Sequence, residues 1–131
     1  MDRHMDRSTI LTFPATLGFP RHAALFARLG LQEIAVDSLR RAIAAIKRTP
    51  PDFILAEFVY AWGNNYASCH ISNLDSLLAS LPKYAPRARV IILAQPGEME
   101  YAQRLGEVYP LHGIAPLSVA EHDLELLLLN E

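Results

Sequence analysis

One acidic residue, Glu57, is the last residue of the most strongly patterned segment of this chain. The segment runs from Pro51 to Glu57 and places a proline–aspartate pair and four apolar residues before the acid. Such an apolar run is typical of a strand that is buried on both faces of a parallel sheet. Glu57 is then expected at the carboxyl end of the strand, where open α/β sheets place ligands and chemistry. It is the first candidate functional residue.

Other reactive side chains form no pattern that supports catalysis or metal binding. Cys69 and His70 are adjacent, and His22 or His112 could join them, but neighbouring residues of a strand or helix point in different directions. No second pair stands at metal-ligand spacing, and the sequence contains neither a Gly-x-Ser-x-Gly turn nor a glycine-rich phosphate loop. We interpret these residues as a loop cysteine and unrelated histidines, and we expect no enzyme activity, no metal and no cofactor.

Length and composition limit the class of protein. A chain of 131 residues, 51% hydrophobic and 20% charged, is expected to form one packed domain, residues 1–131, with a disordered or tag-like start at residues 1–7. The net charge of −2 predicts no nucleic-acid partner and no anionic-membrane partner. No apolar run approaches the ~20 residues that span a bilayer, and a single cysteine suits a reducing compartment. We expect a cytoplasmic protein.

Hydrophobic periodicity predicts five strands that alternate with five helices. The expected strands cover residues 9–13, 33–36, 53–58, 90–94 and 111–115. The expected helices cover residues 21–29, 39–47, about 74–81 and 98–108, and a last helix runs almost to the end of the chain. Five strand–helix units in this order imply a parallel sheet with helices on both faces.

Polar residues and prolines mark the ends of these elements. Asp37 or Ser38 is expected to cap the second helix, and Ser72 or Asn73 is expected to cap the third. Pro82 and Pro86 are expected to bound a linker between the third helix and the fourth strand.

The layout resembles the response-regulator receiver (CheY-like) domains over residues 8–129. The shared features are Pro51-Asp52 before the third strand, the apolar fourth strand, and Pro116 followed by a final helix that Ser118 and Glu121 are expected to open as a capping box. The resemblance implies an α/β, flavodoxin-like (βα)5 three-layer sandwich with a central five-stranded parallel sheet.

The resemblance also assigns positions of the receiver phosphorylation site to this chain. The family's phospho-acceptor aspartate aligns with Glu57, whose carboxylate is one methylene further from the backbone. The acidic pair that holds magnesium aligns with residues 11–16, which contain no carboxylate. The switch hydroxyl aligns with Ala94 and the family's lysine with Ala115, and the switch aromatic lies near His112. The degenerate pocket is thus expected to comprise Phe13, Pro14, Ala94, His112, Ala115 and Pro116.

Phosphoryl transfer depends on positioning and electrostatics, so these replacements imply a degenerate receiver, or pseudo-receiver. We expect a non-catalytic signalling or scaffold module that binds a protein partner independently of phosphorylation and magnesium. One alternative is a small-ligand sensor that binds a metabolite at the carboxyl edge of the sheet. A weaker alternative is an atypical phospho-acceptor that uses Glu57 or His70. Glu57 itself is either a mimic of a phosphorylated aspartate or a solvated carboxylate without a role.

Two further segments are candidates for contacts with other molecules. The loop at residues 58–66 is longer than in most receivers, and its Tyr60, Trp62 and Tyr66 are expected to bind a partner or to close over the pocket as a lid. The last helix contains four consecutive leucines, which cannot all face one core. Since receivers commonly dimerise through their last helices, the resemblance implies a homodimer through Leu126 and Leu129.

Overall fold

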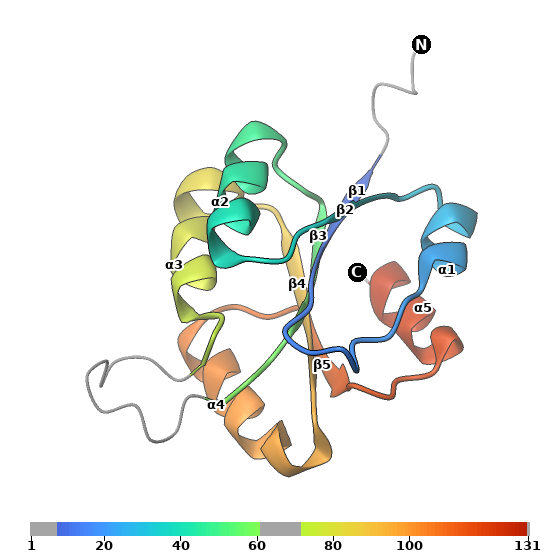
Figure 1. The fold of residues 1–131 in the computed structure, drawn as a ribbon, viewed down its shortest axis with the longest axis vertical. Helices are drawn as coiled ribbons and strands as arrows, with labels where there is room; N and C mark the ends of the chain where they lie inside the picture. The colour runs from blue at the N-terminus through green and yellow to red at the C-terminus, as the bar shows by residue number, and fades with distance from the viewer. Residues whose placement is uncertain (1–7, 61–71, 131) are drawn as a thin grey trace.

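The computed structural model describes residues 8–60 and 72–130, and it shows one parallel sheet between two layers of helices (Figure 1). The strands, in the sheet order β2-β1-β3-β4-β5, are β1 (Thr9–Phe13), β2 (Gln32–Ala35), β3 (Phe53–Glu57), β4 (Arg89–Ala94) and β5 (Gly113–Pro116). The helices are α1 (Ala23–Arg28), α2 (Leu39–Arg48), α3 (Asp75–Tyr84), α4 (Met99–Val108) and α5 (Glu121–Leu129), with a short 3-10 helix, η2 (Pro96–Glu98), before α4. The predicted flavodoxin-like sandwich is confirmed.

The central strands are buried because helices cover both faces of the sheet. Helices α1 and α5 lie on one face, and α2, α3 and α4 lie on the other (Figure 1). In β3, Ile54 and Ala56 pack with the α2–α4 layer, whereas Leu55 packs with α1 and α5. This alternation explains why the apolar run of β3 is continuous. Among the described residues, no helix combines the length and apolarity needed to cross a membrane.

The proline–aspartate pair joins β3 to β1 at the amino edge of the sheet. Asp52 accepts the N–H of Thr9 through Oδ2 at 2.9 Å, and its own N–H donates to the Thr9 oxygen at 3.0 Å. These bonds accompany the register in which Phe53 lies opposite Ile10. Glu57 is consequently the last residue of β3, at the carboxyl edge.

Helix boundaries follow some of the predicted signals and not others. Of the two predicted caps of α2, Asp37 and Ser38, the structure uses Ser38, whose Oγ accepts the Arg41 N–H at 3.1 Å. The linker predicted to begin at Pro82 is wrong, because α3 continues through that proline. The Ala85 N–H then donates to the Leu81 oxygen at 2.8 Å, which closes the last turn.

The capping box predicted from Ser118 and Glu121 is also wrong. Glu121 is the first residue of α5, and the N-cap is Ala120, which has no side chain able to cap. Ser118 lies instead in a turn that the Val119 N–H closes onto the Pro116 oxygen at 2.9 Å. The helix therefore begins two residues later than the pattern indicates, because this turn follows β5 directly.

Candidate functional site

The carboxyl ends of the strands bring most of the predicted pocket residues to one edge of the sheet. Glu57 at the end of β3 pairs in register with Leu93 of β4, and Leu93 pairs with Ala115 of β5. β1 ends at the same edge, since its last residue is paired with the penultimate residue of β3. The predicted pocket residues found at this edge are Phe13, Pro14, Ala94, Ala115 and Pro116.

Glu57 is buried, and its carboxylate is bound by the β1–α1 loop (residues 14–22). Its Oε1 accepts the N–H groups of Ala15 at 2.8 Å and Thr16 at 2.9 Å. Its Oε2 accepts the Thr16 hydroxyl at 2.6 Å. Only 1% of the residue's surface is exposed. The alternative of a solvated carboxylate without a role is therefore wrong.

The β1–α1 loop orients Thr16 toward Glu57. The Thr16 Oγ1 accepts the N–H of Gly18 at 3.2 Å, and the Thr16 backbone oxygen accepts the N–H of Phe19 at 3.3 Å. Because a carboxylate oxygen can only accept, the Thr16 hydroxyl directs its own hydrogen to Glu57. Hydrogen bonds to a charged acceptor are about twice as strong as neutral ones. Uncharged donors thus stabilise a buried negative charge.

The described residues of this edge do not fit a magnesium ion. Magnesium requires several oxygen ligands in near-octahedral geometry. β1 ends in Phe13 and is followed by Pro14, and no carboxylate occurs in residues 8–22. Both oxygens of Glu57 already accept hydrogen bonds. Across residues 8–60 and 72–130, no three His, Cys, Asp or Glu side chains are grouped so that they could hold a metal.

The predicted pocket residues Ala94 and Ala115, near the ends of β4 and β5, carry no reactive group. Ala94 is fully buried and Ala115 is 5% exposed. A methyl group can neither donate a hydrogen bond to a phosphoryl oxygen nor neutralise its charge. These two positions therefore supply none of the electrostatic stabilisation on which group transfer depends.

His112 lies at the opposite end of β5 from this edge. It directly precedes Gly113, where β5 begins, two residues later than predicted. At ~3.3 Å per residue, its backbone lies about 10 Å along the strand from Ala115. Its Nε2 is 2.9 Å from the backbone oxygen of Leu127 in α5, to which it donates. The His112 side chain therefore contacts α5 near the amino end of β5, and it is the one predicted pocket residue that does not lie at the carboxyl edge.

Tyr60, the first of the three aromatic residues predicted to bind a partner, packs on α4. Its ring stacks on Tyr101 with 3.8 Å between the ring centroids and 12° between the planes. Its N–H donates to the Glu98 Oε1 at 3.2 Å. The other residues of interest in this loop lie outside the described residues: Trp62, Tyr66, Cys69 and His70.

Asn73 has a structural role that its position before α3 does not reveal. Its Oδ1 accepts the Val59 N–H at 2.8 Å, and its Nδ2 donates to the backbone oxygen of Glu57 at 3.0 Å. An amide side chain suits this contact because it both donates and accepts. The N-cap of α3 is Leu74, so the prediction that Ser72 or Asn73 caps this helix is wrong, although the Ser72 Oγ accepts the Leu74 N–H at 3.0 Å just before the helix. Asn73 thus holds the backbone that follows Glu57.

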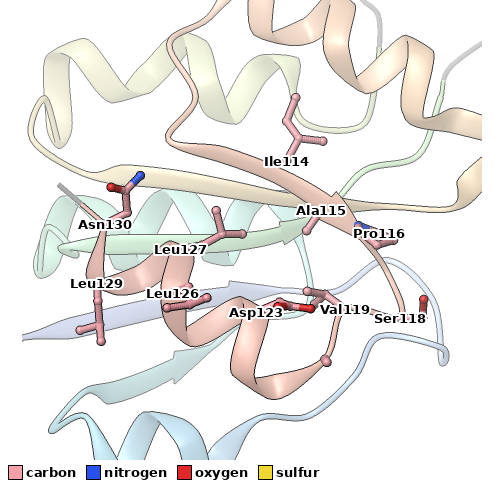
Figure 2. A pocket seen from close by; sticks show the side chains of 11 residues that line it. Ile114, Ala115, Pro116, Ser118, Val119, Asp123, Leu126, Leu127, Leu129 and Asn130 are labelled. Atoms are coloured by element: carbon pink, nitrogen blue, oxygen red, sulfur yellow. The ribbon is translucent and has the colours of Figure 1, made fainter.

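The exposed leucines of α5 border a groove beside β5, the edge strand of the sheet (Figure 2). Leu126 and Leu129 are 55% and 59% exposed, whereas Leu124 and Leu128 are buried. The groove has a volume of ~920 Å³, and Leu127 contributes to its wall. The prediction that α5 leaves leucines at the surface is confirmed, and the homodimer stays a prediction.

Comparison with solved structures identifies the fold. The chain is similar to a response-regulator receiver domain from Clostridium thermocellum (17% identity, TM-score 0.69, covering 94% of this chain and 92% of that one). It is also similar to the signal receiver domain of an HD domain-containing protein from Pseudomonas fluorescens (15%, 0.70, 93% and 91%). A response regulator from Desulfuromonas acetoxidans matches to the same degree (16%, 0.68, 92% and 93%). No family model and no curated protein sequence matches the chain. At these identities the likeness establishes the receiver fold.

Proposed function

We propose that this chain is a non-catalytic signalling module of the pseudo-receiver type, which acts by phosphorylation-independent contact with a protein partner. The observation that carries the proposal is the engagement of both Glu57 carboxylate oxygens by Ala15 and Thr16. A phospho-acceptor must bring a carboxylate oxygen in line with the leaving group of the phosphodonor. Glu57 would first have to break charge-assisted hydrogen bonds and leave a position that is 1% exposed.

The surroundings of Glu57 add a second reason. The transferred phosphoryl group carries negative charge on three oxygens, and enzymes and receivers lower the barrier by placing cations and donors around them. Here the neighbouring strand ends offer the methyl groups of Ala94 and Ala115. These two described positions would therefore give Glu57 no electrostatic help even if its carboxylate were released.

The contact between Glu57 and the β1–α1 loop gives the module a permanent shape at the edge where receivers switch. The bond from Ala15 and those from Thr16 span more than forty residues of sequence, at separations of 42 and 41. A buried carboxylate that is hydrogen-bonded in this way holds the loop without any ligand. In this proposal Glu57 supplies internally the negative charge that a phosphorylated receiver would gain from its donor.

Output then depends on surface contacts, and the groove beside β5 and α5 is the surface best suited to a second copy of the chain. Leu126 and Leu129 stand on its rim with more than half of their surface exposed. Exposed apolar patches rimmed by polar residues are typical of protein interfaces. The solved receiver domains with the same fold support a signalling role for this chain.

Treatment with small phosphodonors tests the proposal. The protein is incubated with acetyl phosphate or beryllofluoride and magnesium, and intact-mass and peptide spectra are recorded at neutral pH. We expect no adduct at any magnesium concentration, while a receiver domain with its acceptor aspartate, treated in parallel, is labelled. A stoichiometric adduct on Glu57 would contradict the proposal.

A further inference from the structure

A cluster of positive charge lies at the amino edge of the sheet, at the opposite end of β3 from Glu57. It is contributed by the last turns of α2 and α3, which lie near the top of Figure 1, and by the segment that leads into β4. Five basic residues at exposed positions form this basic cluster: Lys47, Arg48, Lys83, Arg87 and Arg89. Because the whole chain has a net charge of −2, the positive charge is local.

Two aromatic rings lie within the basic cluster. The Nζ atoms of Lys47 and Lys83 lie 4.8 Å and 5.4 Å from the centroid of the Tyr84 ring. The guanidinium carbon of Arg89 lies 5.8 Å from the centroid of the Phe53 ring. Cation–π contacts of this kind attract a cation to a ring without neutralising its charge. The rings therefore gather the cations at the surface and leave them able to bind an anion.

The basic cluster has no carboxylate partner within residues 8–60 and 72–130. In contrast, Arg28, Arg41 and Arg104, which lie elsewhere on the surface, each form an ion pair with an acidic residue. The described acids in the adjoining segments are Asp52, which already accepts a backbone N–H, and Glu107 near the end of α4. The amino edge consequently carries a surplus of cations around α2, α3 and β4.

Helix dipoles account for only part of this surplus. Basic residues in the last turn of a helix interact favourably with its carbonyl end, and Lys47, Arg48 and Lys83 occupy such positions. Arg87 and Arg89 lie beyond the end of α3, so they do not serve this purpose. Each helix end carries only about half of an elementary charge. Most of the positive charge of the basic cluster therefore remains uncompensated.

An apolar groove of ~570 Å³ adjoins the basic cluster, between α3 and the segment that follows α4. We call it the α3 groove. Aliphatic residues and prolines line it together with Tyr109, and the lining includes the exposed prolines Pro82, Pro86 and Pro110. Proline rings fix the backbone φ angle, so these parts of the wall lose little conformational freedom when the groove is occupied.

The basic cluster and the α3 groove are built from the same short segment of chain. Lys83 directly follows Pro82, which lines the groove. Arg87 stands between Pro86 and Ala88, which also line it. Cations thus form the rim of an apolar depression, and a ligand that contacts one must approach the other.

Anionic partners differ in what they offer to an apolar groove with a basic rim. Single-stranded nucleic acids stack their bases on open aromatic faces, whereas two lysines lie against the Tyr84 ring. Anionic membranes bind surfaces whose apolar side chains protrude into the lipid, whereas the apolar surface here is hollowed. A peptide with acidic residues around apolar ones supplies carboxylates for the rim and side chains for the groove.

We propose that the basic cluster and the α3 groove bind an acidic segment of a protein partner, in which one or two large apolar side chains are flanked by aspartate or glutamate. The apolar side chains enter the groove, and the carboxylates pair with Lys83, Arg87 and Arg89. This inference rests on the proposed function, because it names the kind of protein partner that the module contacts.

Fluorescence anisotropy of the full chain with a labelled synthetic peptide, DEELFEED, tests the proposal. We expect saturable binding with a Kd below about 1 mM, which weakens as the salt concentration rises. A peptide with amides in place of the carboxylates, and one with serine in place of leucine and phenylalanine, should each bind at least about tenfold more weakly. Absence of binding at about 1 mM, or equal binding of either altered peptide, would overturn the proposal.

Charge-matched variants locate the site. The double variant Arg87→Gln/Arg89→Gln should weaken peptide binding at least about tenfold. Arg40→Gln/Arg104→Gln removes the same charge from exposed positions of α2 and α4 outside the basic cluster and should leave binding unchanged. Lys83→Gln/Arg87→Gln provides a second test if loss of the Arg89 contact with Phe53 impairs folding. Equal effects of the matched pairs would show attraction by net charge alone and would reject the site.

Two competing probes test the class of partner. An oligouridine and vesicles of phosphatidylserine with phosphatidylcholine should bind more weakly than the peptide. Tighter binding of either probe, lost in Arg87→Gln/Arg89→Gln, would overturn the peptide assignment in favour of nucleic acid or membrane.

Failure of this inference is distinguishable from failure of the proposed function. A preparation that forms no phosphodonor adduct and does not bind the peptide contradicts the inference alone. An adduct on Glu57 in a preparation that binds the peptide contradicts the proposed function alone.

Discussion

Thr16 satisfies both carboxylate oxygens of Glu57. Its hydroxyl donates to Oε2 at 2.6 Å, and its backbone N–H donates to Oε1 at 2.9 Å. A single loop residue thus holds the side chain that ends β3, across a separation of 41 residues in sequence. The glutamate at the end of β3 consequently contributes to the stability of the fold, and the length of its side chain is part of that contribution.

Substitution of Glu57 should reveal this dependence on length as well as on charge. Glu57→Gln keeps an acceptor for the two N–H groups and loses the charge, so we expect a loss of about 1–3 kcal/mol in the free energy of unfolding. Glu57→Asp keeps the charge and is too short to reach all three donors, so we expect a larger loss. Urea denaturation measures both values.

Controls for this comparison come from the same chain. The same two substitutions at Glu107, an exposed residue of α4, should change stability by less than about 0.5 kcal/mol. Thr16→Val should destabilise the wild type more than it destabilises Glu57→Gln, because the two residues share one contact. An aspartate variant as stable as wild type would contradict the structural role of Glu57.

The groove beside β5 should mediate self-association. Burying one leucine contributes on the order of 1.5–3 kcal/mol, and a two-fold contact repeats it, so Leu126→Glu and Leu129→Glu should weaken the dimer by more than about tenfold. Sedimentation velocity over a concentration series measures the effect. Ala44→Glu, which adds the same charge to an exposed position of α2 on the other face of the sheet, should have no effect. A wild-type protein that is monomeric at high micromolar concentration would remove this proposal.

The loop at residues 58–66 yields a prediction that separates partner binding from packing. If Trp62 binds a protein partner, Trp62→Ala should lower the affinity for that partner and leave the melting temperature nearly unchanged. If it packs as a lid, the same change should destabilise the fold by a few kcal/mol. Tyr101→Leu is the reference for packing, since it removes the stack with Tyr60, a contact of about 0.5–1.5 kcal/mol. No change in either property would exclude Trp62 from both roles.

The partly buried side chain of His22 predicts a dependence of stability on pH. Since desolvation lowers the pKa of His22 in the folded state, the unfolded chain binds a proton at this residue first as pH falls below 6.5. The stability contributed by the neutral ring is therefore complete above pH 6.5 and is lost as pH falls through the folded-state pKa. Glu121 and Glu33 oppose the lowering of the pKa, and Arg21, Asp37 and Arg41 line one cavity together with His22. Because these groups also affect stability as pH changes, the contribution of His22 is obtained by comparing the wild type with a His22 variant.

Unfolding by urea between pH 8 and pH 5 measures this contribution. The wild type should lose more stability over this range than His22→Gln does. His122→Gln, at an exposed position of α5, should follow the wild type. Identical pH profiles for wild type and His22→Gln would show that burial of the His22 ring has no energetic consequence.

The sequence by itself determines the order of the elements and the chemistry that the edge lacks. The apolar runs of β3 and β4 are continuous because helices cover both faces of these strands. Such a run consists of neighbouring residues, so it can be recognised in the sequence alone. The absence of carboxylates in residues 8–22, and the alanines at positions 94 and 115, are likewise facts of residue type. Together they predict a receiver fold without the means of phosphoryl transfer.

Only the tertiary structure decides what Glu57 and the histidines contact. The donors to Glu57 include two backbone N–H groups from a loop about forty residues earlier. Every residue except proline carries such a group, so the residue types of the loop do not reveal these bonds. The contact of His112 with the backbone oxygen of Leu127 depends on how α5 packs on the sheet, which a local sequence signal does not reveal. The unpartnered nitrogen of His22 exists only where the start of α1 meets the ends of β1 and β2, a contact between segments that the chain brings together in space.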